Sequence, residues 1–334
     1  MRNTNLGLIG LGNMGSVHLQ NCLRLQNARL TAVADVSKNA LKKAKKMGVA
    51  NVYEDYRDLL NKSDVDAVII ALPTHLHALC AKMAAESHKS IFLEKPLARN
   101  VGEGREILAL ANKYGVKLAI GYPLRFSPSF QELKAKMESG ELGEIQIAYA
   151  TNIGTGPFVH RSNSVAPLPV PEWWWKKELT GGGALLDLGS HMVNLTQWCF
   201  GEVIEAKSYL GYRLNMDQED HAVCLLKFRH GQIVVISVGW FSQQFHLGLE
   251  VFGTFGSATT ARSPPSKMRT ALQLMFRKSS SFNVPFMKEI QYFADCLQTD
   301  KELQTSGEDA LKDLEVIERA YSNQEKFDQT DVVF

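Results

Sequence analysis

The chain has 334 residues, of which 45% are hydrophobic and 22% are charged, as is ordinary for a globular protein that folds in water. This length allows two domains, each with a core of its own. The formal charge of +2 gives no electrostatic attraction to nucleic acid or to an anionic membrane surface. No apolar run is long enough to span a bilayer, and the polar first residues have no secretory signal pattern.

The cysteines are scattered without the CxxC spacing of a zinc or redox site. Such cysteines are typical of the reducing interior of the cell. We therefore expect a cytoplasmic protein that has neither nucleic acid nor membrane among its partners. The cysteines are Cys22, Cys80, Cys199, Cys224 and Cys296.

Residues 1–122 alternate between strand and helix patterns. The strands are predicted at residues 6–10, 29–36, 65–72, 90–93 and 116–120. A helix pattern follows each of the first four, and Ser37 and Asn100 stand where N-caps belong. This repeat is typical of a doubly wound parallel sheet, so we expect an α/β domain over residues 1–122.

The turn after the first predicted strand reads GLGNMG at residues 10–15, and Asp35 follows twenty residues later. A G-x-G-x-x-G between a strand and a helix, with an acid at that distance, is typical of dinucleotide binding. Gly10 allows the tight turn, Gly12 lets backbone N–H groups approach a pyrophosphate, and Gly15 lets the helix pack on the strand. The start of the helix then faces the phosphates with unpaired N–H groups. The alternative is an ordinary glycine-rich turn.

Asp35 ends the second predicted strand, where the adenosine ribose of a dinucleotide lies. Its carboxylate can accept hydrogen bonds from the ribose hydroxyls and repels the 2′-phosphate of NADP. We therefore expect NAD to be favoured over NADP, although Lys38 nearby weakens the preference. The alternative is that Asp35 is a turn residue that caps the next helix.

After residue 122 the pattern changes to a few helices and many strands. Helices are predicted at residues 128–138, 183–200, 285–297 and 306–321, and strands at 144–152 and within 203–260. Two of the strands flank His230-Gly231, which predicts an antiparallel hairpin. We expect residues 123–334 to form an α+β domain with a large, mostly antiparallel sheet and a long loop at 261–283. Helices on one face leave the other to pair with a second subunit, giving a dimer or tetramer.

Six motifs make the chain resemble the Gfo/Idh/MocA oxidoreductases, named after glucose–fructose oxidoreductase and inositol dehydrogenase. In the family's order they are GLGNMG at 10–15, VAD at 33–35, LPTHLHA at 72–78, EKP at 94–96, GYPLRF at 121–126 and GGGALLDLGSH at 181–191. The resemblance covers nearly the whole chain. It implies an N-terminal Rossmann domain that binds NAD and a C-terminal domain for substrate binding and oligomerisation.

The resemblance also implies a set of residues that contact the cofactor. They are Gly10, Gly12, Asn13, Met14, Gly15, Asp35, Leu72, Pro73, His77, Glu94 and Lys95. His75 and His77 suggest a metal site at first sight. At the start of a helix they point in different directions and have no third ligand near them in sequence, so we expect no metal. His77 lies close to the cofactor or is a structural histidine.

Catalysis is implied for three residues. Lys95 holds the substrate oxygen and offsets the charge of the developing alkoxide, His191 takes the hydroxyl proton, and Asp187 supports the imidazole. Asp187 and His191 are four residues apart and share one helical face, and the glycines at 181–183 let the chain approach the cofactor. The alternatives are a surface lysine before a turn proline and an ordinary helix-surface pair. The Lys95–Pro96 bond is expected to be cis, as in relatives.

Substrate contacts are expected from Arg125, Trp173 and Asn194. Many relatives carry Asp where this chain has Asn194, and Trp-Arg where it has Trp173-Trp174-Trp175. The tryptophans stack on a sugar ring or the nicotinamide, or they wall the loop. Arg125 reaches the substrate or braces the domain junction.

These features predict an NAD-dependent dehydrogenase that transfers a hydride between nicotinamide and a CH–OH carbon of a sugar, cyclitol or nucleotide sugar. Two alternatives use the same scaffold: a glycosidase that oxidises its substrate transiently with bound NAD, and a non-catalytic protein that senses NAD or a sugar. Retention of Lys95, Asp187 and His191 argues against the sensor.

Overall fold

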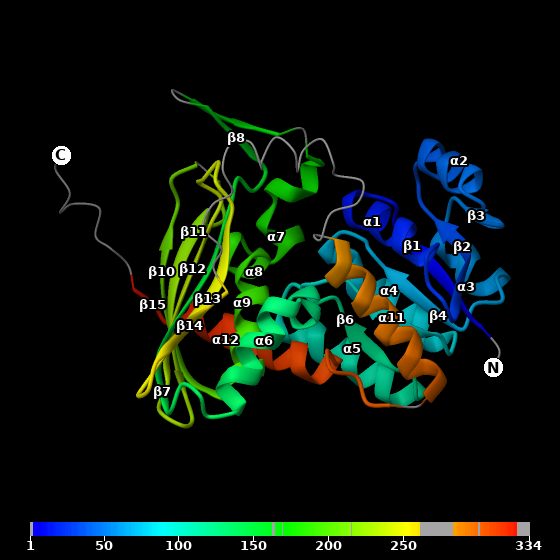
Figure 1. Cartoon of the computed structure of the whole chain (residues 1–334). Coiled ribbons are helices and arrows are strands. Elements are labelled where there is room, and N and C mark those ends of the chain that lie inside the picture. The colour runs from blue at the N-terminus through cyan, green and yellow to red at the C-terminus, as the bar shows by residue number, and fades with distance from the viewer. Residues whose placement is uncertain are drawn as a thin grey trace, which may run out of the picture. The chain divides into compact units, whose positions relative to one another are not determined.

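The computed structural model describes residues 3–161, 164–168, 170–214, 216–260, 283–299 and 301–325. The loop expected at 261–283 lies outside the described residues except for residue 283. The chain divides into two compact units, shown in Figure 1. The first comprises Met1–Ser127 and Arg269–Leu311, and the second comprises Pro128–Met268 and Lys312–Phe334.

The first unit contains a six-stranded parallel sheet in the order β3-β2-β1-β4-β5-β6. Its strands are β1 Thr4–Ile9, β2 Ala28–Ala34, β3 Asn51–Tyr53, β4 Ala67–Ile70, β5 Ser90–Leu93 and β6 Leu118–Ile120. This is the Rossmann order, which confirms the predicted fold class. The strand order reverses between β1 and β4, and ligands of such sheets bind beyond the carboxyl ends of the strands at that point.

Helices connect these strands, and the predicted caps are present. Ser37 accepts a hydrogen bond from the amide of Ala40, and Asn100 accepts one from the amide of Glu103. Glu103 does not complete a capping box, because its carboxylate binds Arg99 instead. The helices are α1 Asn13–Cys22, α2 Lys38–Lys46, α3 Tyr56–Lys62, α4 His77–Glu86 and α5 Val101–Tyr114, with short 3₁₀ turns η1 Thr74–Leu76 and η2 Pro123–Phe126.

Helix α11, Asn283–Thr299, belongs to the first unit by its contacts (orange in Figure 1). It packs on α1, β1 and β5, and it places Ile290, Phe293 and Ala294 in the core around that sheet. The boundary expected at residue 122 put this helix in the second domain. An amphipathic pattern indicates which face of a helix is buried, but not which core receives it.

The second unit is built on a seven-stranded sheet in the order β14-β13-β7-β12-β11-β10-β15. The pairs β7–β12 and β10–β15 are parallel and the other four are antiparallel, as the prediction of a mostly antiparallel sheet requires. The strands are β7 Ile145–Ile153, β10 Val203–Gly211, β11 His221–Phe228, β12 Ile233–Gly239, β13 His246–Gly253, β14 Ser257–Thr259 and β15 Gln324–Glu325.

Several helices and a small hairpin complete this unit. Helices α8 and α9 contact β11, β12 and β7. The hairpin, at residues 158–167, lies in a segment for which no strand was predicted. The elements are α6 Pro128–Glu138, β8 Phe158–Arg161, β9 Ser164–Pro167, η3 Glu172–Trp175, α7 Lys177–Thr180, α8 Ala184–Asp187, α9 Gly189–Phe200 and, across the unit boundary, α12 Gly307–Ser322.

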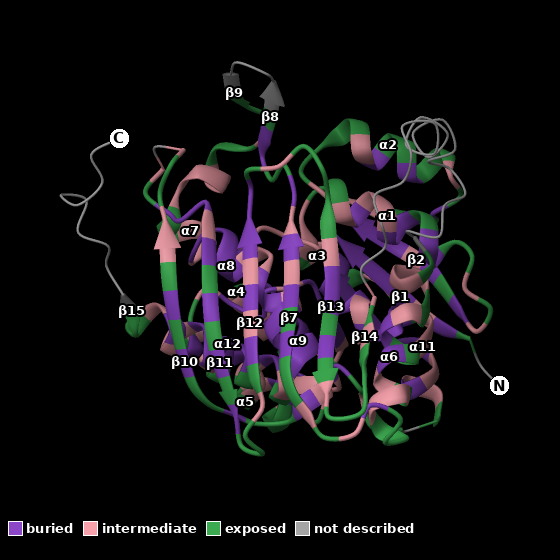
Figure 2. Ribbon diagram, turned by 60° about the vertical axis from the view of Figure 1, so that its left-hand side comes forward, coloured by how far each residue is buried: buried purple, intermediate pink, exposed green. Residues whose placement is uncertain are grey.

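The opposite face of this sheet is exposed and carries large apolar side chains beside the charged Lys207, Lys227 and Glu250. Along β11 the residues alternate between buried and exposed, and Figure 2 shows the same alternation on its neighbours. The side chains on the exposed face are between 39% and 45% accessible. We call this surface the open face, made of Ile147, Tyr149, Tyr209, Val223, Leu225, Ile233 and Phe252.

Candidate functional site

The turn between β1 and α1 has the geometry that its glycines predict. Gly10 has a φ of +91°, and a Cβ there would overlap the carbonyl oxygen of Ala71. A Cβ at Gly15 would overlap the carbonyl oxygen of Gly10. At Gly12 no described atom lies within 4 Å of the Cβ position, and Gly12 and Asn13 are exposed. Two glycines therefore serve the fold, and Gly12 leaves open space above the loop.

Asp35 joins this turn to the end of β2. Its Oδ2 accepts a hydrogen bond from the amide of Leu11 at 2.6 Å, and its Oδ1 accepts one from the amide of Ser37 at 2.7 Å. The N-cap of α2 is Ser37, so Asp35 is not the cap of that helix. The next residue, Val36, is 90% exposed and offers an apolar surface beside the carboxylate.

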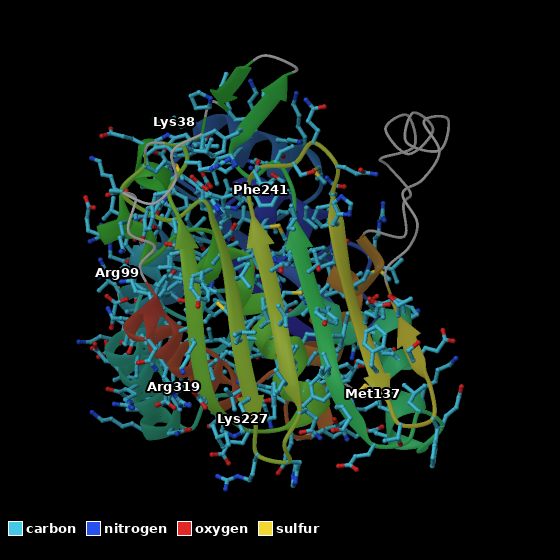
Figure 3. All side chains as sticks on the ribbon, turned by 90° about the vertical axis from the view of Figure 1, so that its left-hand side faces the viewer. Lys38, Arg99, Met137, Lys227, Phe241 and Arg319 are labelled. Carbon is cyan, nitrogen blue, oxygen red and sulfur yellow. The ribbon has the colours of Figure 1, made fainter. Side chains whose placement is uncertain are left out.

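Lys38 lies near Asp35 in sequence and is labelled in Figure 3. Its ammonium group is 3.5 Å from the carboxylate of Glu54, and both side chains are exposed. The neighbouring negative charge reduces the attraction that Lys38 exerts on a phosphate.

His77 connects the loops that follow β4 and β5. Its Nδ1 is 2.9 Å from the carbonyl oxygen of Pro96, and its Nε2 is 2.9 Å from that of Leu72. The side chain is buried, and burial lowers its pKa. Both ring nitrogens face protein carbonyls, which favours the structural alternative for His77. Lys95 is half-buried, and the Lys95–Pro96 bond is cis, as expected.

Glu94 is buried inside the first unit. Its Oε1 is 2.5 Å from Nε2 of His18 on α1, and its Oε2 accepts a hydrogen bond from the amide of Lys95 at 3.2 Å. The carboxylate was expected to contact the cofactor, but these internal partners already engage both oxygens. His18 was not predicted, although its place three residues after Gly15 puts it on the first turns of α1.

A second carboxyl group, Glu289 on α11, is buried close enough to Glu94 for the charge of Glu94 to act on it. Glu289 is 1% exposed, and burial together with the charge of Glu94 raises its pKa well above the usual range. Neither of its oxygens has a hydrogen-bond partner among the described residues. Sequence reasoning missed Glu289, because one acid in an amphipathic helix gives no sign of its burial.

Arg125 was expected to reach the substrate or to brace the domain junction, and its contacts with Gln304 and Asp309 lie within the first unit. It is 5% exposed, and its guanidinium donates to the carbonyl oxygen of Gln304 and lies 3.1 Å from the carboxylate of Asp309. These contacts fix η2 within the first unit and engage the charge that was expected to meet the substrate.

In the second unit, Asp187 ends α8 and His191 lies in the first turn of α9. Both residues are half-buried. One helix was predicted over 183–200, and the structure has two that meet at Leu188. The side chain of Asn152 donates to the carbonyl of Leu188 at 3.2 Å, but the φ of −88° and ψ of −35° there are helical, so the spacing of four residues is kept.

Asn194 is committed to an internal contact. It is 1% exposed, and its amide donates to the carboxylate of Asp313 at 2.7 Å. The amide of Gln197 donates to the other oxygen of Asp313, also at 2.7 Å. Asn194 thus ties α9 to α12, and its buried amide is not offered to a substrate.

The three tryptophans of η3 pack against other rings. The ring centroid of Trp174 is 5.4 Å from that of Trp240, and Trp175 is 5.6 Å from Phe158. Trp173 is half-buried and 6.0 Å from Trp174. The packing of Trp174 and Trp175 on Trp240 and Phe158 favours the alternative in which the tryptophans wall the loop.

The described part of the chain contains no group of three His, Cys, Asp or Glu side chains arranged to hold a metal ion. Among the helices in that part, none has the length and hydropathy needed to cross a membrane.

Comparisons with known proteins identify relatives of both units. Residues 4–122 match the oxidoreductase family with an NAD-binding Rossmann fold, and residues 130–259 match the GFO/IDH/MocA C-terminal domain.

The chain is 32% identical over 325 residues to the uncharacterized oxidoreductase YrbE of Bacillus subtilis, and the match covers 92% of this chain and 90% of that protein. It is 31% identical over 264 residues to a myo-inositol 2-dehydrogenase of Thermotoga maritima, which covers 75% of this chain and 73% of the relative. A crystal structure of GenD2 from gentamicin A biosynthesis, in complex with NAD, has the same fold, with a TM-score of 0.83 at 23% identity over 97% of this chain and 94% of that one.

Proposed function

Because the chain belongs to the Gfo/Idh/MocA family of oxidoreductases, we propose that it is an NAD-dependent dehydrogenase acting on a CH–OH carbon of a cyclitol, sugar or nucleotide sugar. The observation that carries the proposal is the turn at Gly12. No described atom lies within 4 Å of a Cβ at Gly12, and the amide of Leu11 beside it donates a hydrogen bond to the carboxylate of Asp35. The relative of 31% identity that is named a myo-inositol 2-dehydrogenase makes polyols the first substrates to test.

The turn after β1 fits a dinucleotide, since a Cβ at Gly12 would meet no described atom and the first turn of α1 presents its amides there. Asp35 would receive the ribose hydroxyls, and the exposed Val36 would pack on the adenine. We therefore propose NAD as the cofactor, with NADP disfavoured. When bound, the nicotinamide supplies the hydride chemistry.

Three side chains are assigned the proton and charge chemistry. Lys95 stabilises the negative charge that develops on the substrate oxygen, and His191 accepts the hydroxyl proton. Asp187 orients the imidazole of His191 and stabilises its protonated form. We leave Glu94, Arg125 and Asn194 out of the site, because each is buried and internal contacts hold its polar groups. Asp35 stays in, because it is half-buried and each carboxylate oxygen can accept a second hydrogen bond.

The proposal is tested by following NADH formation with a panel of inositols, sugars and nucleotide sugars. His191→Ala and Lys95→Ala should each lose about 10²–10⁴-fold in kcat while NADH affinity stays near that of the wild type. His230→Ala, in the exposed turn between β11 and β12, is the matched control and should keep full activity. Hydrolysis of a glycoside without net NADH would favour the glycosidase, and NAD binding without turnover across the panel would favour the sensor.

We also propose that the protein forms a dimer or tetramer through the open face. Seven large apolar side chains are spread over five neighbouring strands there, and the rings of Tyr149 and Phe252 meet edge to face at 5.9 Å. Figure 3 views the sheet from this side, with Lys227 and Phe241 near its opposite ends. An apolar patch of this kind is typical of a subunit interface.

A further inference from the structure

Glu219 is a fully buried residue just before β11 that organises the start of α8. Its Oε1 accepts hydrogen bonds from the amides of Gly183 at 3.0 Å and Leu185 at 2.9 Å. The hydroxyl of Tyr321, on α12, donates to the same oxygen at 2.7 Å. The backbone carbonyl of Glu219 accepts from the amide of Ala184 at 2.9 Å. Three consecutive amides at the start of α8 are therefore bound by one residue.

The glycine run before α8 exists for these contacts. A Cβ at Gly183 would overlap the carbonyl oxygen of Glu219, and a Cβ at Gly182 would overlap the hydroxyl of Tyr321. Gly181 has a φ of +87° and ends α7. The run was expected to let the chain approach the cofactor, but two of its glycines are required by Glu219 and Tyr321.

Helix α8 depends on these partners because it is only four residues long. The first amides of a helix have no acceptor within it, and a single turn is not stable in isolation. No side chain next to Gly183 caps α8, so the acceptor is supplied by a residue 36 positions away. Asp187 closes the turn, since its amide donates to the carbonyl of Gly183 at 3.0 Å. The position of the Asp187 backbone therefore depends on the position of Gly183.

We propose that Glu219 and Tyr321 are positioning residues for Asp187, and through Asp187 for His191, because they fix the first turn of α8. The inference rests on the proposed function, since it takes Asp187 and His191 as the proton-handling pair. Burial raises the pKa of Glu219 although its three donors oppose this. Its Oε2 has no partner among the described residues, so an amide at this position keeps the acceptor and loses little.

The test compares Glu219→Ala, Glu219→Gln and Tyr321→Phe, with Tyr114→Phe at the end of α5 in the first unit as a matched control. Glu219→Ala should lower kcat by about 10–100-fold, since a small misplacement of a catalytic group has this effect, and should change the Kd of NADH by less than about two-fold. The kcat of Glu219→Gln should be within about three-fold of that of the wild type. The kcat of Tyr321→Phe should lie between those of Glu219→Ala and Glu219→Gln. In an Asp187→Asn background Glu219→Ala should add almost nothing, because both changes act through one group.

A second readout does not depend on turnover. The NMR titration midpoint of His191, assigned by its absence in His191→Ala, should move in the same direction in Glu219→Ala and Asp187→Asn. In Glu219→Gln the titration midpoint of His191 should equal that of the wild type. If no substrate is turned over, the proposed function fails. The titration of His191 would still test whether Glu219 positions Asp187. Full additivity of Glu219→Ala with Asp187→Asn, or an unmoved midpoint in folded Tyr321→Phe and Glu219→Ala, would overturn the inference.

Discussion

Glu289 is a carboxyl group enclosed in the first unit beside Glu94, and this has a consequence for stability. Its pKa is raised in the folded protein above the usual value of 4.5. The folded state therefore holds a proton that the unfolded state releases as the pH rises above 4.5. The favourable contribution of the protonated group is complete below that pH, and it is lost as the pH rises toward the folded pKa.

We predict that Glu289→Gln becomes more stable relative to the wild type as the pH rises from 5 to 8. Between pH 5 and pH 8 this gain should be roughly 1–4 kcal/mol, since each pH unit over which only the folded state holds the proton of Glu289 costs the wild type about 1.4 kcal/mol. Urea unfolding at pH 5 and pH 8 measures the difference in free energy of unfolding between Glu289→Gln and the wild type. Glu86→Gln on the exposed surface of α4 is the control. If this difference in free energy of unfolding were the same at both pH values, Glu289 would not titrate in this range.

Asp35 governs the second prediction at the scale of single residues. The wild type should bind NADH at least about 10-fold more tightly than NADPH, because the carboxylate repels a 2′-phosphate. Asp35→Asn should narrow this ratio, mainly through tighter NADPH binding. Lys38→Ala should change it little, since Glu54 already lies against that ammonium group. Fluorescence titration with both nucleotides decides the matter, and equal binding by the wild type would refute the role of Asp35.

At the scale of elements, the turn between β1 and α1 offers a matched pair of variants. Gly12→Ala places a methyl group in open space, so the melting temperature should stay within about 2 °C of the wild type while NADH binding weakens by about 10-fold or more. Gly15→Ala forces a methyl group onto the carbonyl oxygen of Gly10 and should lower the melting temperature clearly. Thermal unfolding and NADH titration of both variants are the measurements. Equal NADH affinity in Gly12→Ala would show that no pyrophosphate lies there.

Much of this element structure could be predicted from sequence. The bounds of β5 and α6 agree with the predicted residues, and Ser37 and Asn100 cap the helices that they were expected to cap. These features depend on neighbours within a few residues, which a local pattern can report. The β8–β9 hairpin was missed, because Pro157, Pro167, Pro169 and Pro171 in and around it are typical of a loop and a two-stranded ribbon needs little apolar alternation.

The candidate site was predicted less completely, and the reason is physical. The glycine turn and Asp35 act within one βα unit, so their roles followed from spacing. Glu94, Arg125 and Asn194 instead meet partners 76, 184 and 119 residues away, namely His18, Asp309 and Asp313. A polar side chain in a motif has the same sequence pattern whether it faces a ligand or a buried partner.

At the scale of the whole molecule, the open face makes a prediction about assembly. We expect a dimer or tetramer at micromolar concentration, and Leu225→Lys should shift it to smaller species by placing like charges across the interface. Leu23→Lys changes a leucine of nearly equal exposure, 41% against 42%, in the first unit and should leave assembly intact. Light scattering measures the mass of all three proteins. A monomeric wild type would rule out the interface.

The place of α11 in the first unit has a consequence for how the chain is made. Residues 1–122 leave the ribosome before residues 283–306, and at the usual pace of synthesis the delay is roughly 10–30 s. During that time Phe92 lacks its partner Phe293, and the edge of β6 lacks the amide-to-carbonyl bond from Ile120 to Thr305. The nascent sheet thus exposes an apolar surface and an unpaired strand edge, which are the features that chaperones bind and that lead to aggregation. The first unit therefore begins to form early in synthesis but is completed only after most of the second unit has been made.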